Sequence, residues 1–264
     1  MPTLITYKIT PASTGYLAPY TGGYIRGLFL SLVKNIDPAL AEILHETRMI
    51  KPYAIKPLRP INEKMRIDRG GWRIHKNMKL IFDISLIDDE LKEILFKQFL
   101  TLNRVKIGNL EFKIEEIEVK FERFEQMFQA EKSSQVEIIF ATPTCFKDPI
   151  TRYYLYPRPD KIFYNLLKIW NTYAPESVRI KKNDLDKELS MIDIHEYQIV
   201  TREVFIDENI KILGFKGSIR LDIKNFEDTK AVFPLLALSK YSNVGYGRTY
   251  GLGSVMITKK AEQN

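Results

Sequence analysis

The chain has 264 residues, of which 45% are hydrophobic and 28% charged, and its net charge is +7 at neutral pH. This length and composition are typical of a soluble globular protein with one large domain or two small ones. A single cysteine excludes an internal disulfide and a zinc cluster built from several thiolates. We find no leader pattern and no apolar run of about 18 residues, so we expect a cytoplasmic protein with no part in a membrane.

The first third of the chain predicts one strand followed by two helices. Residues 3–10 alternate weakly between apolar and polar side chains, which indicates a strand. After a turn-rich stretch, apolar residues recur at spacings of three and four from Tyr24 onward, which predicts a helix. Asp37 and Pro38 predict the start of a second helix, with Asp37 as its N-cap. Several prolines follow His45, so this helix must end soon after it.

The next part of the chain completes a recognisable order of elements. Residues 79–86 read as a strand, Asp88 as the N-cap of another helix, and Gly108-Asn109 as the turn of a hairpin. The parity of apolar residues switches at Glu115-Glu116, which predicts a bulge or turn there. The connection after His45 has room for one more strand. The first half is therefore close to the βαββαβ ferredoxin-like pattern.

The second half repeats a similar order after a polar linker at residues 125–134. The pattern predicts a strand, then a helix opening at Pro159 and a long hairpin closed at residues 207–209. A short helix near Pro234 and a last strand at residues 251–258 follow. We therefore expect an α+β protein with two tandem ferredoxin-like domains, residues 1–128 and 129–264.

Positive charge is concentrated in residues 47–79, which contain ten basic and two acidic residues. This local sum of +8 exceeds the total of +7, so the remaining chain carries about −1. We predict a surface loop that contacts a phosphate backbone, with Tyr53 and Trp72 available to stack on bases. A solvated basic loop is the alternative. The candidate RNA-binding side chains are Arg48, Lys64, Arg66, Arg69, Arg73 and Lys76.

A glycine-rich segment, residues 245–253, lies between a predicted helix and the last strand. It is neither a P-loop nor a dinucleotide fingerprint, because its spacing differs and a strand follows it. Its glycines permit positive φ and a close approach of backbone N–H groups to a phosphate. A purely structural loop is the alternative, while the nearby cations favour an anion. The candidates are Lys240, Gly245, Gly247, Arg248, Gly251 and Gly253.

Three histidines limit the candidates for proton transfer. His45 lies at the end of a predicted helix, where the helix dipole favours the imidazolium, and Lys51 follows six residues later. A histidine and a lysine suit proton transfer and charge stabilisation at a phosphodiester. A histidine that caps helix carbonyls is the alternative. His75 lies in the basic segment, where a catalytic role, RNA binding and no role all stay open, whereas His195 and Cys145 read as structural.

Four segments together resemble a known family. They are Leu44-His45-Glu46, residues 51–58, residues 142–146 and the glycine-rich segment at residues 245–253. In this order they resemble the CRISPR repeat-processing endoribonucleases of the repeat-associated mysterious protein superfamily. The resemblance implies metal-independent cleavage of precursor CRISPR RNA within each repeat, with no cofactor. The RNA's own 2′-hydroxyl would be the nucleophile, leaving a 2′,3′-cyclic phosphate and a 5′-hydroxyl.

The resemblance also implies roles for individual residues. It places a general acid/base at His45 and a stabiliser of transition-state charge at Lys51. Some members carry a tyrosine in the preceding helix where this chain has Leu30, so Tyr24 is only a substitute candidate. CRISPR repeat RNA is the expected partner, and effector-complex proteins and a homodimer stay open. A non-catalytic RNA-binding subunit of an effector complex is the alternative function, and a DNA-binding protein is a third.

Overall fold

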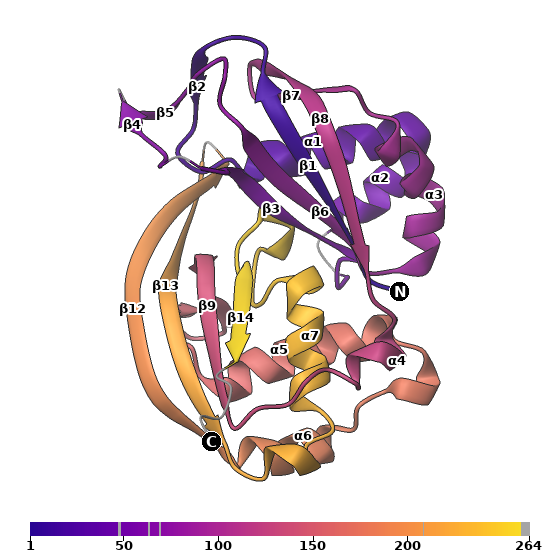
Figure 1. Cartoon of the computed structure of the whole chain (residues 1–264), viewed down its shortest axis with the longest axis vertical. Coiled ribbons are helices and arrows are strands. Elements are labelled where there is room, and N and C mark those ends of the chain that lie inside the picture. Colours follow the sequence, from indigo (N-terminus) through magenta and orange to yellow (C-terminus); the bar gives the residue numbers. More distant parts are fainter. Residues whose placement is uncertain (47–48, 63, 69, 208, 260–264) are drawn as a thin grey trace.

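The structure is a computed structural model that describes residues 1–46, 49–62, 64–68, 70–207 and 209–259. Its N-terminal domain has a five-stranded antiparallel sheet in the order β3-β6-β1-β8-β7 (Figure 1). The strands are β1 (Thr3–Pro11), β3 (Tyr53–Pro60), β6 (Leu80–Leu86), β7 (Arg104–Ile107) and β8 (Leu110–Phe121). Its helices are α1 (Gly22–Ile36), α2 (Pro38–His45) and α3 (Asp89–Leu100).

The C-terminal domain has a four-stranded antiparallel sheet in the order β12-β13-β9-β14. The strands are β9 (Gln135–Thr144), β12 (Ile192–Asp207), β13 (Ile210–Ile223) and β14 (Val255–Lys259). Its helices are α4 (Phe124–Met127), α5 (Pro159–Tyr173), α6 (Lys182–Leu189) and α7 (Val232–Ser242), with 3₁₀ turns η1 (Glu176–Val178), η2 (Phe226–Asp228) and η3 (Arg248–Tyr250).

Two small sheets complete the described part of the chain. One contains β2 (Gly15–Leu17), β5 (Gly71–Ile74) and β4 (Ile67–Asp68), and the other is the hairpin of β10 (Phe146–Asp148) and β11 (Arg152–Tyr154). In each large sheet the first strand of the domain lies between its third and fourth core strands, which is the ferredoxin-like order. The predicted α+β class with two tandem ferredoxin-like domains is confirmed.

Local sequence signals explain where the N-terminal elements begin. The Asp37 carboxylate accepts a hydrogen bond from the Leu40 N–H at 3.0 Å, and Pro38 opens α2. The Asp88 carboxylate accepts from the Leu91 N–H at 3.1 Å at the start of α3. Lys8 faces Glu116 and Ile9 faces Ile114, so Glu115 is the extra residue of the predicted bulge. These three predictions are confirmed.

Each sheet buries one face against its helices. On β1 the residues Ile5, Tyr7 and Ile9 alternate with more exposed neighbours and point into the N-terminal core. In the C-terminal domain α5 packs its apolar side on the sheet, and Trp170 is fully buried. Phe124 of α4 lies edge-on to Trp170, so this short helix packs into the C-terminal core. The predicted linker at residues 125–134 is therefore partly helical.

The basic segment at residues 47–79 is not the single long loop that we expected. Its described residues contribute β3 to the large sheet and β4 and β5 to the small one. The last strand also begins later than predicted, at Val255, because residues 251–253 form a turn after η3. No helix among the described residues is long and apolar enough to cross a membrane.

Candidate functional site

Lys51 folds back on the end of α2 that carries His45. His45 is the last residue of this helix, and its side chain is exposed. The ammonium of Lys51 turns back on the same helix end, donating a hydrogen bond to the carbonyl oxygen of Glu46 and lying 3.4 Å from that of Ile43. The C-terminal carbonyls of a helix attract a cation. The helix end therefore holds the lysine charge near the exposed histidine.

The environment of Lys51 weakens its hold on its proton. Partial burial lowers the pKa of the Lys51 ammonium, the positive charge of Arg26 lowers it further, and Glu46 opposes the change. A lysine with a lowered pKa gives up its proton at a lower pH than a lysine in water.

Arg26 is a part of this site that the sequence analysis missed. Its guanidinium lies over the ring of Tyr250 at 4.5 Å from the centroid, and its Nε is buried with no hydrogen-bond partner among the described residues. It stands alone as a charged side chain in the apolar first twelve residues of α1, residues 22–33. That isolated charge is the signal that the sequence offers for Arg26.

Arg248 has a different place from the one predicted. It is only 8% exposed, and its guanidinium donates hydrogen bonds to the carbonyl oxygens of Ser242 at 2.9 Å and Lys51 at 3.2 Å. Burial lowers the pKa of this guanidinium to about 10. Because its donors are used inside the fold, Arg248 is a structural residue rather than an RNA contact, and that prediction is corrected.

The glycine-rich segment is likewise an internal connection. Gly245, Gly247, Gly251 and Gly253 all have positive φ, between 69° and 84°. The N–H of Gly245 donates to the Asn165 side chain, that of Gly251 to the Arg248 carbonyl and that of Gly253 to the Pro143 carbonyl. These three N–H groups do not face a phosphate. The structural alternative for the segment is therefore the correct one for them.

This segment also joins the two domains. A Cβ added at Gly251 would lie 2.7 Å from the Pro57 ring of β3, so only glycine permits the contact. The side-chain amide of Asn243 donates to the carbonyl oxygens of Ile55, at 2.8 Å, and of Leu252, at 3.2 Å. These contacts therefore join β3 of one domain to the segment between α7 and the last strand of the other.

Tyr24 does not join His45 and Lys51. It is 40% exposed on α1 and lines a hollow of about 880 Å³ with Tyr16 and Lys106. Its ring lies beside Gly108 at the β7–β8 turn, and neither His45 nor Lys51 is among the residues lining that hollow. Leu30 instead packs against the N-terminal core. A catalytic role of Tyr24 therefore stays a prediction, with no contact to His45 or Lys51 among the described residues to support it.

The basic side chains of the segment at residues 47–79 lie on the surface as predicted, but its aromatic residues do not. Lys64, Arg66, Arg73 and Lys76 are exposed, whereas Arg48 and Arg69 lie outside the described residues. Side chains alternate along β5, so Trp72 and Ile74 point inward while Arg73 points out. Tyr53 and Trp72 are both 0% exposed, so the prediction that they stack on bases is wrong. The exposed aromatic residue paired with Arg73 is Tyr16.

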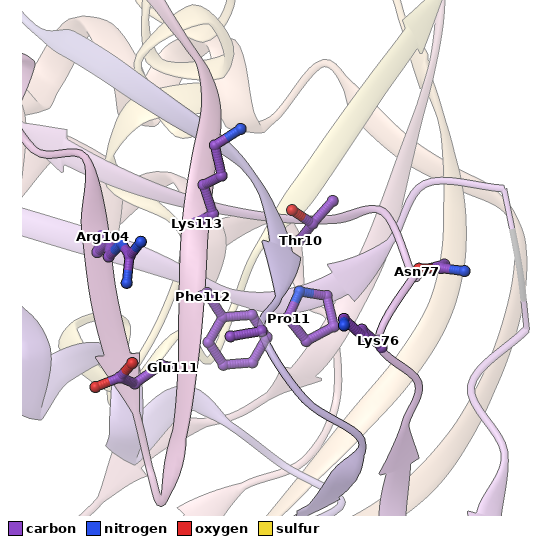
Figure 2. Close-up of a pocket in the computed structure, with 9 residues that line it drawn as sticks. Thr10, Pro11, Lys76, Asn77, Arg104, Glu111, Phe112 and Lys113 are labelled. Carbon is purple, nitrogen blue, oxygen red and sulfur yellow. The ribbon is translucent and has the colours of Figure 1, made fainter.

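Lys76 is joined by two cations from distant parts of the chain. Lys76, Arg104 and Lys113 surround a hollow of about 400 Å³ that also includes Glu111 (Figure 2). Figure 2 shows Arg104 and Lys76 on opposite sides of the Pro11 and Phe112 rings. The basic surface therefore extends from β5 to β7 and β8.

A larger cleft of about 1050 Å³ lies between the two domains, lined by residues of both large sheets. Its charges are mixed. Asp83 is 2% exposed and accepts two hydrogen bonds from the Arg59 guanidinium, with the Lys56 ammonium at 3.7 Å. Asp83 therefore offsets one of the two positive charges that Lys56 and Arg59 bring to this cleft.

The remaining candidates are spread over the molecule. Lys240 is exposed on α7, and His75 is exposed between β5 and β6. His195 pairs with Asp222 across the hairpin at 2.9 Å. Burial raises the pKa of the Cys145 thiol to about 12, as suits a packing residue. No cluster of three or more His, Cys, Asp or Glu side chains suited to a metal occurs among the described residues.

Two family models match most of the chain. Residues 1–134 match the CRISPR Cas6 N-terminal domain, and residues 138–255 match the CRISPR-associated endoribonuclease Cas6. No curated protein sequence matches.

Several solved structures share the fold across nearly the whole chain. A Cas6 product complex aligns with a TM-score of 0.76 and 21% identity, covering 98% of this chain and 100% of that one. Thermus thermophilus Cas6 aligns with a TM-score of 0.68 and 22% sequence identity, covering 98% of each chain. A Cas6-related protein from Pyrococcus furiosus aligns with a TM-score of 0.64 and 14% sequence identity, covering 99% of this chain and 100% of that one.

Proposed function

Because the chain belongs to the Cas6 family of CRISPR-associated endoribonucleases, we propose that it cleaves precursor CRISPR RNA within the repeats, without a metal ion. The observation that carries this proposal is that Lys51 folds back on the helix end that carries His45. Structures similar to this chain include a Cas6 product complex and a Cas6 substrate-mimic complex, which supports repeat RNA as the substrate.

The reaction uses a nucleophile that the RNA itself supplies. The 2′-hydroxyl oxygen forms a bond to the adjacent phosphorus, and the bond from phosphorus to the 5′-oxygen breaks. His45 removes the proton from the 2′-hydroxyl or gives one to the leaving 5′-oxygen. The products are a 2′,3′-cyclic phosphate and a 5′-hydroxyl. Since the nucleophile is already attached, much of the rate enhancement comes from holding the in-line geometry.

Lys51 and Arg26 place positive charge beside this step. Lys51 stabilises the negative charge that develops on the phosphate oxygens, and Arg26 adds a second cation next to it. The exposed cations of the basic segment and of Figure 2 hold the RNA backbone. They are Lys64, Arg66, Arg73, Lys76, Arg104 and Lys113.

The direct test is incubation of the protein with the repeat RNA of its own locus in excess EDTA, followed by mapping of the product ends. We expect one cut per repeat, with a 2′,3′-cyclic phosphate on one product and a 5′-hydroxyl on the other. Cleavage that stops with chelator and returns with added metal would contradict the metal-free scheme. A 3′-hydroxyl with a 5′-phosphate would contradict attack by the 2′-hydroxyl.

A second candidate function is a non-catalytic RNA-binding subunit of a CRISPR effector complex. Leu30 favours it, because the position lacks the tyrosine of fuller active sites and packs in the core. Tight binding of the repeat RNA with no cleavage by the wild-type protein would select this alternative. Equal competition by duplex DNA would instead indicate a DNA-binding protein.

A further inference from the structure

Five tyrosines gather on the C-terminal domain around the β10–β11 hairpin. We call them the tyrosine patch. None belongs to a regular core position, and each is half-buried or exposed. The patch consists of Tyr153 and Tyr154 of β11, Tyr156 after it, Tyr197 of β12 and Tyr246 of the glycine-rich segment.

The rings of the tyrosine patch contact one another from different elements. Tyr153 and Tyr246 have centroids 6.0 Å apart, and Tyr156 meets Tyr197 edge-on at 5.5 Å. Behind Tyr153 and Tyr246 lies a small apolar cluster that includes Cys145 and Leu252. The fold therefore supports these rings from behind and leaves their outer sides accessible.

Three of these rings carry a cation. The Lys147 ammonium lies 4.7 Å from the centroid of Tyr246, the Arg152 guanidinium 5.1 Å from that of Tyr153, and the Lys161 ammonium 5.4 Å from that of Tyr154. Lys147 and Arg152 are exposed, so each covers a ring from the solvent side. Contacts of this kind are weak at exposed sites.

These three cations form no ion pair with a carboxylate of the described residues, and two nearby acids are already engaged. Asp148 accepts hydrogen bonds from the N–H groups of Ile150 and Thr151 in its own turn, at 3.0 and 2.9 Å. Asp160 is held by Arg158 at 2.8 Å. Lys161 interacts electrostatically with Asp148, which leaves the charges of Lys147 and Arg152 available to an external anion.

Rings with mobile cations above them suit an unpaired nucleotide. A base stacks on the tyrosine face, and the displaced lysine or arginine moves to the phosphate of the same strand. A double helix does not offer its base faces to protein side chains in this way. The chemistry of the patch therefore selects single-stranded over duplex nucleic acid.

The tyrosine patch is continuous with the candidate active site. Tyr246 and Tyr250 belong to the same glycine-rich segment, and Tyr250 carries the Arg26 guanidinium on its ring. Arg26 in turn acts on the charge of Lys51. The patch and the proposed catalytic lysine are therefore linked through Tyr246, Tyr250 and Arg26.

We propose that the tyrosine patch binds unpaired nucleotides of the RNA that flank the cleavage site, by stacking bases on Tyr153 and Tyr246 and pairing phosphates with Lys147 and Arg152. The identity of the RNA as a CRISPR repeat rests on the proposed function. Binding of a single strand by the patch does not require that cleavage take place.

The test measures binding of a fluorescent twelve-nucleotide oligouridylate and, separately, cleavage of the repeat RNA at saturating concentration. The double variant Tyr153→Leu and Tyr246→Leu should weaken oligouridylate binding by about tenfold or more, since stacking contributes that much per base. Tyr153→Phe with Tyr246→Phe keeps the rings and should retain the affinity. The saturated cleavage rate should change little in either variant.

The matched control is a tyrosine outside the patch that also has a cation over its ring. Tyr164 on α5 has the Lys182 ammonium 4.9 Å from its ring centroid and donates a hydrogen bond to Asp186. Tyr164→Leu should leave oligouridylate binding unchanged. If the leucine variants fail to fold, Lys147→Gln with Arg152→Gln tests the same surface and should weaken binding and flatten its salt dependence.

Four outcomes separate this inference from the proposed function. Unchanged oligouridylate affinity in the folded leucine variants, or in the glutamine variants, would overturn the patch while leaving cleavage untouched. An equal loss in the Tyr164 control would also overturn it. If the wild-type protein cuts no repeat RNA but the patch variants lose oligouridylate binding, the result would support the patch and refute the proposed function. Loss of oligouridylate binding with normal saturated cleavage would support both.

Discussion

The guanidinium of Arg248 donates a hydrogen bond to the backbone carbonyl of Lys51 at 3.2 Å, although 197 positions separate the two residues in the sequence. The donor belongs to the glycine-rich segment of one domain, and the acceptor lies two residues before β3 in the other. The C-terminal domain thereby holds the backbone of the proposed catalytic lysine.

Replacing Arg248 tests this positioning role. Arg248→Met leaves two buried carbonyl oxygens without their donor, which costs about 1–3 kcal/mol for each buried group left unsatisfied. We expect a lower melting temperature and a slower saturated cleavage, with the RNA dissociation constant nearly unchanged. A large rise in the dissociation constant with normal stability would return Arg248 to the RNA-binding surface.

Replacing His45 tests proton transfer. His45→Ala should slow repeat cleavage by about 10²-fold or more while RNA affinity is kept, because the side chain acts only in the transition state. His75→Ala is the matched control, since His75 is also an exposed histidine but lies between β5 and β6 rather than at the end of α2. Single-turnover rates and binding isotherms measure both effects. Full activity of His45→Ala would remove it from the mechanism.

The lowered pKa of Lys51 predicts a particular pH profile. As pH rises, the ammonium loses its proton and its stabilising charge below the ordinary lysine value of about 10.4. After the rate of RNA hydrolysis without protein is subtracted, the cleavage rate should therefore begin to fall at a lower alkaline pH than it would with a lysine of ordinary pKa. Lys51→Arg keeps a cation throughout and should abolish that fall, whereas Lys51→Ala should be slow at every pH. An alkaline fall that persists in Lys51→Arg belongs to another group.

Neutralising the exposed basic surface should weaken RNA binding and its dependence on salt. The variant changes four side chains to Gln, which are Lys64, Arg66, Arg73 and Lys76. A plot of log affinity against log salt concentration has a slope of about 0.7 per phosphate contact, so we expect the steepness of this plot to fall by up to about 3. The control neutralises four exposed lysines on other elements, which are Lys97, Lys181, Lys187 and Lys224. Equal slopes in the two variants would mean that the basic surface has no special part in binding.

Two glycines give opposite predictions for stability. Gly251 has φ +79° and no room for a Cβ beside Pro57, so Gly251→Ala should destabilise by more than about 1 kcal/mol. Gly27 lies inside α1 with nothing within 4 Å of an added Cβ, so Gly27→Ala should stabilise by about 0.4–1 kcal/mol. Denaturant unfolding of both variants measures the difference. A stable Gly251→Ala would show that the contact between domains tolerates the side chain.

Local signals predicted much of the fold. Asp37 and Asp88 cap helices because a carboxylate reaches its own backbone N–H groups, and the bulge at Glu115 follows from side-chain parity. These contacts lie within a few residues or one strand pair, so their pattern is written in the adjacent sequence.

The site was harder to predict because its contacts are distant in sequence. Trp72 and Arg73 are neighbours with opposite orientations, and net charge along the chain does not tell which side of β5 faces water. Arg248 looked like an anion ligand until its partners Ser242 and Lys51 were known. Arg26 became visible only through Tyr250, more than two hundred residues later.

The β12–β13 hairpin has a consequence for the spacing of the two domains. Pairing with β9 begins at Phe215, so the part of the hairpin from Phe215 to its tip projects past the sheet toward α1 (Figure 1). There a Cβ added at Gly23 would lie 2.3 Å from the Ile206 carbonyl oxygen. Two residues added to each strand lengthen this projection by about 6.8 Å. One residue added to β12 would instead turn the Ile206 side chain to the other face of the hairpin. The contact between this hairpin and α1 therefore depends on the length of the projecting part and on the register of its two strands.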